Sequence, residues 1–183
     1  MENPVLASLP FHVPLQQRMI YAGVGSRETP PEMLATMTKV AKRLDELGYI
    51  LYSGGAAGAD MAFERGAAKK RIFFALQATN DERAQELVNE VHPFPSALRQ
   101  YPRDLMARNA YQVFGKEMDT PVDFVLCWTP DGVEHHEQRK HSTGGTGQAI
   151  SLASLKGIPV VNMANPDWKN KLKLLVMPDI PHE

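Results

Sequence analysis

Short apolar runs alternate with segments of helical periodicity along most of the chain, and this alternation restricts the fold more than any other feature. The apolar runs cover residues 19–25, 49–52, 71–76, 122–128 and 158–163. The helical segments cover residues 30–47, 59–69, 80–91, 103–114 and 147–156, with a last helix opened by Asn165 and Pro166. Alternating strands and helices need right-handed crossovers, which produce a mostly parallel sheet with helices on both faces. The sequence therefore predicts a doubly wound α/β domain whose sheet has five or more strands, in the order 3-2-1-4-5.

The strongest helix signal follows the first apolar run. Thr29 is predicted to cap this helix, Pro30 fits its first position, and Glu32 completes a capping box. Apolar residues then recur at spacings of three and four, and Gly48 is placed to end the helix. The sequence thus predicts a strand, a tight glycine turn and a helix as its first unit.

The length of 183 residues suits one domain with one core. Residues 1–17 contain Pro4, Pro10 and Pro14 and no sustained period, so we expect an arm that lies over the domain or mediates subunit contact. Residues 18–183 are expected to form the domain. The single cysteine, Cys127, lies in an apolar run and is expected to be a buried structural thiol.

The charge of the chain favours a small ligand over long nucleic acid. A formal net charge of -1 provides no general basic field, and the sequence shows no basic groove interleaved with aromatic residues. The net charge does not exclude a local basic patch. No apolar run approaches the roughly 20 residues that a bilayer crossing needs, and the N-terminus has no secretion signal. We therefore expect a cytoplasmic protein without a membrane partner.

Glycine-rich loops follow the predicted strands one, two and four. The predicted strand order reverses its direction of growth between strands one and four, so a ligand-binding crevice is expected at their carboxyl ends. The loop residues predicted to bind the ligand there are Gly23, Gly25, Ser26, Arg27, Ser53, Gly54, Gly55, Gly58, Asp60, Thr143, Gly144, Gly145, Thr146 and Gly147.

These loops are suited to phosphate. Glycines let backbone N–H groups approach a ligand closely, and the N-terminus of a following helix favours an anion. Ser26, Ser53, Thr143 and Thr146 could add hydroxyl donors, and Arg27 a guanidinium. Alternatively, each loop is only a tight turn that lets helix and sheet pack, but three such loops at neighbouring strand ends favour binding. None has the Walker pattern with its lysine, so ordinary ATP hydrolysis is not predicted.

Several of these segments resemble a known superfamily. Ser53-Gly54-Gly55-Ala56-Ala57-Gly58-Ala59-Asp60, followed by Ala62 and Gly66-Ala67, resembles the signature of the DNA-processing protein A (DprA/Smf) family. The combination of Gly25-Ser26-Arg27, Arg108-Asn109 and Gly144-Gly145-Thr146-Gly147 resembles the related lysine-decarboxylase-like, or LOG, proteins and molybdenum-cofactor carriers. The resemblance covers about residues 18–163 and implies a Rossmann-like nucleotide-binding domain of the SLOG superfamily.

What the resemblance implies for function depends on one departure from the pattern. The superfamily includes phosphoribohydrolases, single-strand DNA binders and sensors of signalling nucleotides in antiphage defence. In the hydrolases, a proline precedes the second glycine motif, and a threonine and a catalytic glutamate follow it. Here Thr143 replaces the proline, Gln148 the threonine and Ser151 the glutamate. The resemblance therefore implies nucleotide binding but argues against hydrolysis by the usual route.

Four residues have both a functional and a structural interpretation. Asp60 and Glu64, four residues apart, are the carboxylates that hydrolysis would need. Asp60 either binds a ribose hydroxyl or caps its own helix through a backbone amide, and Glu64 is otherwise a solvated or ion-paired residue. Arg108 and Asn109 either contact a phosphate or base across the crevice or form a salt bridge and a cap.

The polar segment 129–143 is predicted to be a long exposed loop. Its ionisable residues are Asp131, Glu134, His135, His136, Glu137, Arg139, Lys140 and His141. The acidic and histidine side chains could hold a metal ion, but adjacent histidines on a polar loop are more often solvated, so no metal site is predicted. The loop is predicted instead to be a lid that closes Arg139, Lys140 or His141 over a bound phosphate.

The function predicted first is binding of a phosphorylated nucleotide or nucleotide-derived small molecule by a sensor, carrier or sequestering protein. N-glycosidic hydrolysis of nucleoside monophosphates or nucleotide sugars is the first alternative, and single-stranded DNA binding of the DNA-processing type is the second. No cofactor is predicted. Because members of the superfamily often self-associate, the resemblance also implies a homodimer or a larger homo-oligomer.

Overall fold

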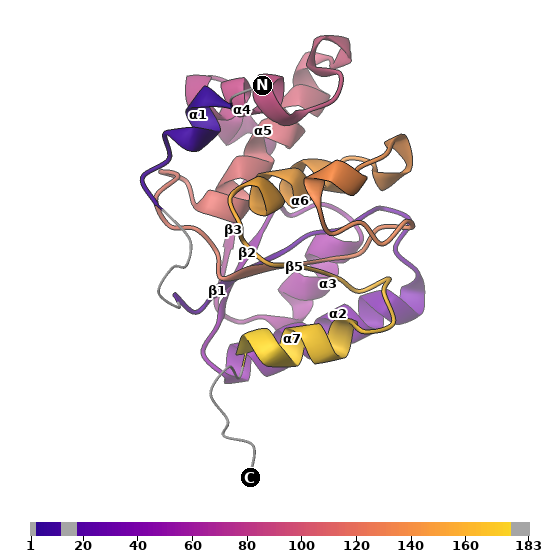
Figure 1. Ribbon diagram of the computed structural model, residues 1–183. Coiled ribbons are helices and arrows are strands. Elements are labelled where there is room, and N and C mark those ends of the chain that lie inside the picture. Colours follow the sequence, from indigo (N-terminus) through magenta and orange to yellow (C-terminus); the bar gives the residue numbers. More distant parts are fainter. Residues whose placement is uncertain (1–2, 12–17, 177–183) are drawn as a thin grey trace.

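The fold is built on a five-stranded parallel sheet with the strand order β3-β2-β1-β4-β5, as Figure 1 shows. It comes from a computed structural model in which residues 3–11 and 18–176 are described. The strands are β1 (Ile20–Gly23), β2 (Ile50–Ser53), β3 (Lys70–Ile72), β4 (Phe124–Cys127) and β5 (Val160–Asn162). The predicted doubly wound α/β class and the predicted strand order are confirmed.

Helices cover both faces of this sheet. The α-helices are α1 (Pro4–Ala7), α2 (Pro31–Glu46), α3 (Ala59–Gly66), α4 (Glu82–Val91), α5 (Gln100–Phe114), α6 (Thr146–Leu155) and α7 (Trp168–Val176). Short 3-10 turns lie at η1 (Ala75–Ala78), η2 (Pro95–Ala97), η3 (His136–Gln138) and η4 (His141–Thr143). In Figure 1, α2, α3 and α7 lie on one face, and α1, α4, α5 and α6 lie on the other.

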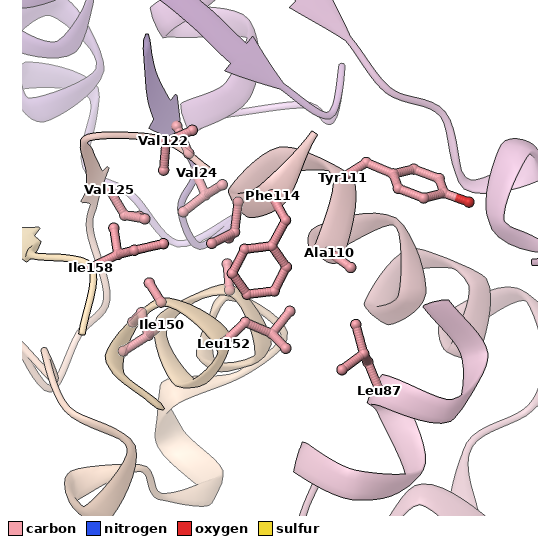
Figure 2. Close-up of a cluster of buried hydrophobic side chains, with 14 of the residues drawn as sticks. Val24, Leu87, Ala110, Tyr111, Phe114, Val122, Val125, Ile150, Leu152 and Ile158 are labelled. Carbon is pink, nitrogen blue, oxygen red and sulfur yellow. The ribbon is translucent and has the colours of Figure 1, made fainter. Parts of the chain in front are cut away.

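Each face has its own apolar core. On the α2–α3–α7 side, Tyr21 of β1 stacks on Phe124 of β4, with ring centroids 5.8 Å apart. On the other side, α5 and α6 pack over the sheet, and Figure 2 shows Phe114 directed from α5 towards Ile150 and Leu152 of α6. The two cores follow from the alternation of strand side chains between opposite faces of the sheet.

Several predicted boundaries and one predicted cap are wrong. The run 71–76 was expected to be a strand throughout, but β3 ends at Ile72 and η1 begins at Ala75. Helix α2 begins at Pro31, and its N-terminus has no side-chain cap. The Thr29 hydroxyl instead donates a hydrogen bond of 2.5 Å to the carbonyl of Ser26, in the turn that precedes the helix. A local turn thus competes successfully for the hydroxyl that capping would need.

The described part of the N-terminal arm, residues 3–11, packs on the domain. The Glu90 carboxylate of α4 accepts hydrogen bonds from the backbone N–H groups of Val5 and Leu6, at 2.7 and 3.1 Å. Leu9 and Phe11 are also buried, in the core to which α4 and α5 contribute. The rest of the predicted arm, residues 1–2 and 12–17, lies outside the described residues.

Two further expectations concern burial and membrane crossing. Cys127 is fully buried in β4, and burial raises the pKa of its thiol, so it is the structural thiol that the sequence predicts. Within residues 3–11 and 18–176, none of the helices has both the length and the apolar character that a membrane crossing requires.

Gly66 sets the distance between α2 and α3. A Cβ atom added at Gly66 would lie 2.1 Å from the carbonyl oxygen of Thr38 and 2.9 Å from the Cβ of Ala41. The Thr38 hydroxyl also donates a hydrogen bond of 2.8 Å to the carbonyl of Ala62. Because the obstructing atoms at Thr38 belong to the backbone, α3 can pack this closely only if residue 66 is glycine.

We expect Gly66→Ala to destabilise the fold, because the added methyl group overlaps the backbone of α2. The loss should be about 1–3 kcal/mol in the free energy of unfolding, measured by urea denaturation. The control is Arg65→Ala, which removes an exposed side chain of the same helix and should change stability by at most about 0.5 kcal/mol. Equal stability of the two variants would contradict the close packing of α2 and α3.

Candidate functional site

A cavity of about 660 Å³ opens at the carboxyl ends of β1 and β4, where the strand order reverses. Its walls come from four segments that are distant in sequence: the loop after β1, the loop before α3, one face of α5, and the loop before α6. This is the position at which open parallel sheets bind ligands, because the connections on either side leave in opposite directions. Among the described residues, this cavity is therefore the candidate functional site.

The structure brings most of the predicted site residues into this cavity. The predicted residues that line it are Gly25, Ser26, Arg27, Asp60, Arg108, Asn109, Thr143, Gly144, Gly145 and Thr146. The predicted residues that do not line it are Gly23, Ser53, Gly54, Gly55, Gly58, Gly147 and Glu64. The second group still contributes to the site, because Gly54 holds the lining residues Arg108 and Asp60 in place through its backbone.

Three of the residues outside the cavity have structural roles. A Cβ atom at Gly23 would lie 2.7 Å from the ring of Phe63, so this glycine lets α3 approach β1. The Ser53 hydroxyl donates a hydrogen bond of 2.7 Å to the Glu64 carboxylate. Glu64 therefore has a structural partner and does not provide a second carboxylate in the cavity.

Gly54 lies between two charged side chains that both line the cavity. A Cβ atom at Gly54 would come within 2.8 Å of both the Arg108 guanidinium and the Asp60 carboxylate. Arg108 donates hydrogen bonds to the carbonyl oxygens of Gly54, at 2.5 Å, and Phe73, at 3.2 Å. Asp60 accepts hydrogen bonds from the backbone N–H groups of Gly54, at 3.2 Å, and Ala56, at 3.3 Å. The glycine is thus required for space, and both charges have backbone partners.

The environment of Asp60 makes its carboxyl unusual. It is only 5% exposed, and burial raises its pKa to about 6, against the charge of Arg108 and the two backbone hydrogen bonds, which lower it. Its bonds to Gly54 and Ala56 use Oδ2, and no hydrogen bond to Oδ1 is found within the described part of the chain. The predicted cap of its own helix is therefore wrong, because Asp60 lies inside α3, which has no side-chain cap, and it holds the amides of the preceding loop instead. Asp60 also lines the cavity.

The loop before α6 is held by Asp131. The Asp131 carboxylate accepts hydrogen bonds from the hydroxyls of Thr143, at 2.7 Å, Ser142, at 3.0 Å, and Thr129, at 2.8 Å. These bonds lower the pKa of the Asp131 carboxyl. Gly144 follows with a φ of 69°, a left-handed conformation that favours glycine, and the chain then enters α6 at Thr146. A carboxylate thus fixes the loop that presents the N-terminus of α6 to the cavity.

The segment 129–143 is more buried than an exposed loop. Thr129, Val133 and Thr143 are buried, and Glu134 accepts a hydrogen bond of 2.6 Å from Lys171 of α7. The prediction of an exposed loop is therefore only partly right: residues such as Pro130, His135 and Lys140 are exposed, whereas buried hydrogen bonds tie Thr129 and Val133 to Asn162.

The residues of the predicted lid lie in different places. Arg139 points to α6, where its guanidinium donates to the side chains of Gln148, at 3.2 Å, and Ser151, at 3.3 Å, whereas His141 lines the cavity. Within residues 3–11 and 18–176, no three His, Cys, Asp or Glu side chains gather closely enough to hold a metal ion.

Three lining residues on α5 are not among the residues that the sequence predicts for the site. Leu105, Met106 and Gln112 of α5 line it together with Arg108 and Asn109. The signal was present, since Gln112 follows these two at helical spacings of four and three and so shares their face. It was hidden because the opposite side of α5 is apolar and core-facing, and a single glutamine in such a helix has no distinctive pattern.

We expect acid to stabilise the wild-type protein relative to Asp60→Asn. The pKa of Asp60 rises from its ordinary 3.8 to about 6 in the folded state, so on acidification the folded state binds this proton before the unfolded state does. Stability should therefore increase as the pH falls from about 7 to about 4, by about 2–3 kcal/mol relative to the variant. Urea denaturation of both proteins over this pH range tests the prediction. If the two proteins showed the same dependence of stability on pH, the raised pKa of Asp60 in the folded state would be contradicted.

Comparisons of the chain with protein-family models, with curated proteins and with solved structures found no match.

Proposed function

We propose that the cavity binds a phosphorylated nucleotide or a small molecule derived from one. The observation that carries this proposal is the convergence of the N-terminus of α6, through Gly145 and Thr146, with Arg27 and Arg108 on one cavity. Backbone N–H groups in the first turn of a helix have no partner within the helix, and they attract anions. Two guanidinium groups that line the same cavity add positive charge, which suits the cavity to phosphate.

Arg27 is the more adaptable of the two cations. Its side chain is exposed, and within the described part of the chain it takes part in no ion pair. Arg108, by contrast, is 6% exposed, and one of its guanidinium nitrogens donates hydrogen bonds to two backbone carbonyls. Arg27 can therefore move to meet a phosphate, while Arg108 supplies a fixed positive charge deeper in the cavity.

The remaining surface of the cavity supports a ligand larger than phosphate. A volume of about 660 Å³ lies within the range of roughly 300–1,000 Å³ that small-molecule sites occupy. Val24, Leu105 and Met106 add apolar surface to the lining, next to the polar groups. A nucleotide has the same combination of an anionic end and a flat apolar body.

A binder that senses, carries or sequesters its ligand agrees with the residues beyond the second glycine loop. Ser151, at the position of the hydrolase glutamate, is fully buried on α6 and does not line the cavity. Its hydroxyl lies 2.8 Å from Nδ1 of His136 and accepts a hydrogen bond from Arg139. This residue therefore serves packing within the helix layer.

Asp60 favours N-glycosidic hydrolysis as the second candidate function. A buried carboxyl in a cleft with a pKa of about 6 can hold or release a proton near neutral pH. In such a reaction the carboxyl would donate its proton to the departing base as the N-glycosidic bond breaks. Water would supply the hydroxyl that the sugar gains, and the remaining proton of that water would return to the carboxylate. The binder ranks first because Ser151 stands at the position of the hydrolase glutamate, and Glu28, the other acidic residue among the described residues of the lining, is exposed to solvent.

We expect Arg27→Ala to weaken binding of phosphorylated ligands by about 10-fold or more, because one charge-assisted contact to phosphate is lost. Isothermal titration calorimetry with nucleoside 5′-monophosphates at low ionic strength measures this. The control is Arg43→Ala, which removes an exposed cation on α2 that pairs with Glu46 and lies outside the cavity. Unchanged affinity in Arg27→Ala, or an equal loss in the control, would contradict the proposed phosphate site.

Chromatography of the same nucleotides after incubation with the protein distinguishes the two candidate functions. A binder leaves every nucleotide intact. Release of free base by the wild-type protein, at a rate that falls at least about 100-fold in Asp60→Asn, would favour the hydrolase instead.

A further inference from the structure

Gln112 is the least explained polar residue in the described part of the cavity. It lies on α5 with 1% of its surface exposed, and among residues 3–11 and 18–176 neither its amide nitrogen nor its amide oxygen has a hydrogen-bond partner. Buried side-chain amides are almost always paired, because leaving them unpaired is unfavourable. A helix that only needed to fill space here would carry an apolar residue. The glutamine therefore needs a reason beyond packing.

Its position supplies one. Gln112 lines the cavity, and it follows Arg108 and Asn109 on the same face of α5. Asn109 donates a hydrogen bond of 3.4 Å to the carbonyl of Gly145, which ties this face to the loop before α6. The unpaired amide is therefore held at a defined place relative to the glycine loop, on a rigid helix.

The neighbouring surface suits a flat ring. Val24, Leu105 and Met106 line the same cavity and are apolar. A planar side-chain amide presents one donor and one acceptor side by side, and it pairs with a ligand edge that offers an acceptor beside a donor. Glutamine reads bases in this two-contact manner in nucleic-acid recognition.

We infer that Gln112 is the specificity-determining residue of the cavity and reads the edge of a heterocyclic base through paired hydrogen bonds. The inference rests on the proposed nucleotide binding and deepens it, because it identifies the part of the ligand that the protein selects. Phosphate contacts at the α6 end hold any phosphorylated sugar. The amide of Gln112 distinguishes ligands that carry a base with a donor beside an acceptor from those that do not.

The test is Gln112→Met, which keeps the volume of the side chain and removes both polar atoms. Affinities are measured by calorimetry for the four common nucleoside 5′-monophosphates and for ribose 5-phosphate, which has no base. We expect the wild-type protein to prefer at least one nucleotide over ribose 5-phosphate, and the variant to lose about 10- to 100-fold of that preference. Its affinity for ribose 5-phosphate should not change.

The midpoint of thermal unfolding without ligand is a second measurement. If Gln112 had a purely structural role, Gln112→Met would lower this midpoint. Removing two unpaired buried polar atoms should leave the unfolding midpoint of Gln112→Met at or above that of the wild-type protein. A lower midpoint together with an unchanged base preference would overturn the inference and assign Gln112 to packing.

The control is Gln148→Met, which changes another fully buried glutamine, on α6 and outside the cavity lining. It should keep the base preference of the wild-type protein, although losing the bond from Arg139 should lower its stability. Equal wild-type affinities for all nucleotides and for ribose 5-phosphate would overturn the role of Gln112 while leaving phosphate binding intact. Absence of binding by every phosphorylated compound would overturn the proposed function itself, and the inference with it.

Discussion

The candidate site depends on the buried guanidinium of Arg108. This side chain reaches from α5 to the carbonyl of Gly54, just after β2, and to that of Phe73, just after β3. It thereby attaches the helix that forms one wall of the cavity to the ends of two strands. A buried arginine is costly unless its N–H groups are paired, so these carbonyl contacts stabilise both the charge and the position of α5. Gly54 permits the arrangement because any side chain there would occupy the space of the guanidinium.

Asp60, which lines the cavity, and Asp131, which holds the loop before α6, have opposite environments. Asp131 accepts hydrogen bonds from three hydroxyls, which favour its ionised form and lower its pKa. Asp60 is almost fully buried, so loss of hydration outweighs the nearby charge of Arg108 and raises its pKa. Asp131 can therefore act as a fixed anchor for the loop before α6. Asp60 retains a protonation equilibrium near neutral pH, inside the cavity, where a ligand would alter it.

Much of the site could be predicted from the sequence because glycine-rich loops are local features. Gly25, Ser26 and Arg27 closely follow a strand, and residues 143–145 directly precede a helix, so their place at the sheet edge follows from chain order. Gln112 could not be found in this way, because its importance depends on the absence of partners around a buried amide. The partly buried course of segment 129–143 was missed for a related reason. Its polar composition indicates exposure, whereas its hydrogen bonds to α6 and α7 arise only after the helices have packed.

The sequence by itself determined the alternation of strands and helices, the parallel sheet and its strand order. These follow from hydrophobic periodicity and from the handedness of crossovers, both of which act over short stretches of chain. Only the tertiary structure decided which polar groups face the cavity and which are used for packing. Glu64 pairs with Ser53 and leaves the site, whereas Asp60, on the same helix, stays in it. The physical reason is that the partner of a polar side chain is set by whichever segments the fold brings next to it.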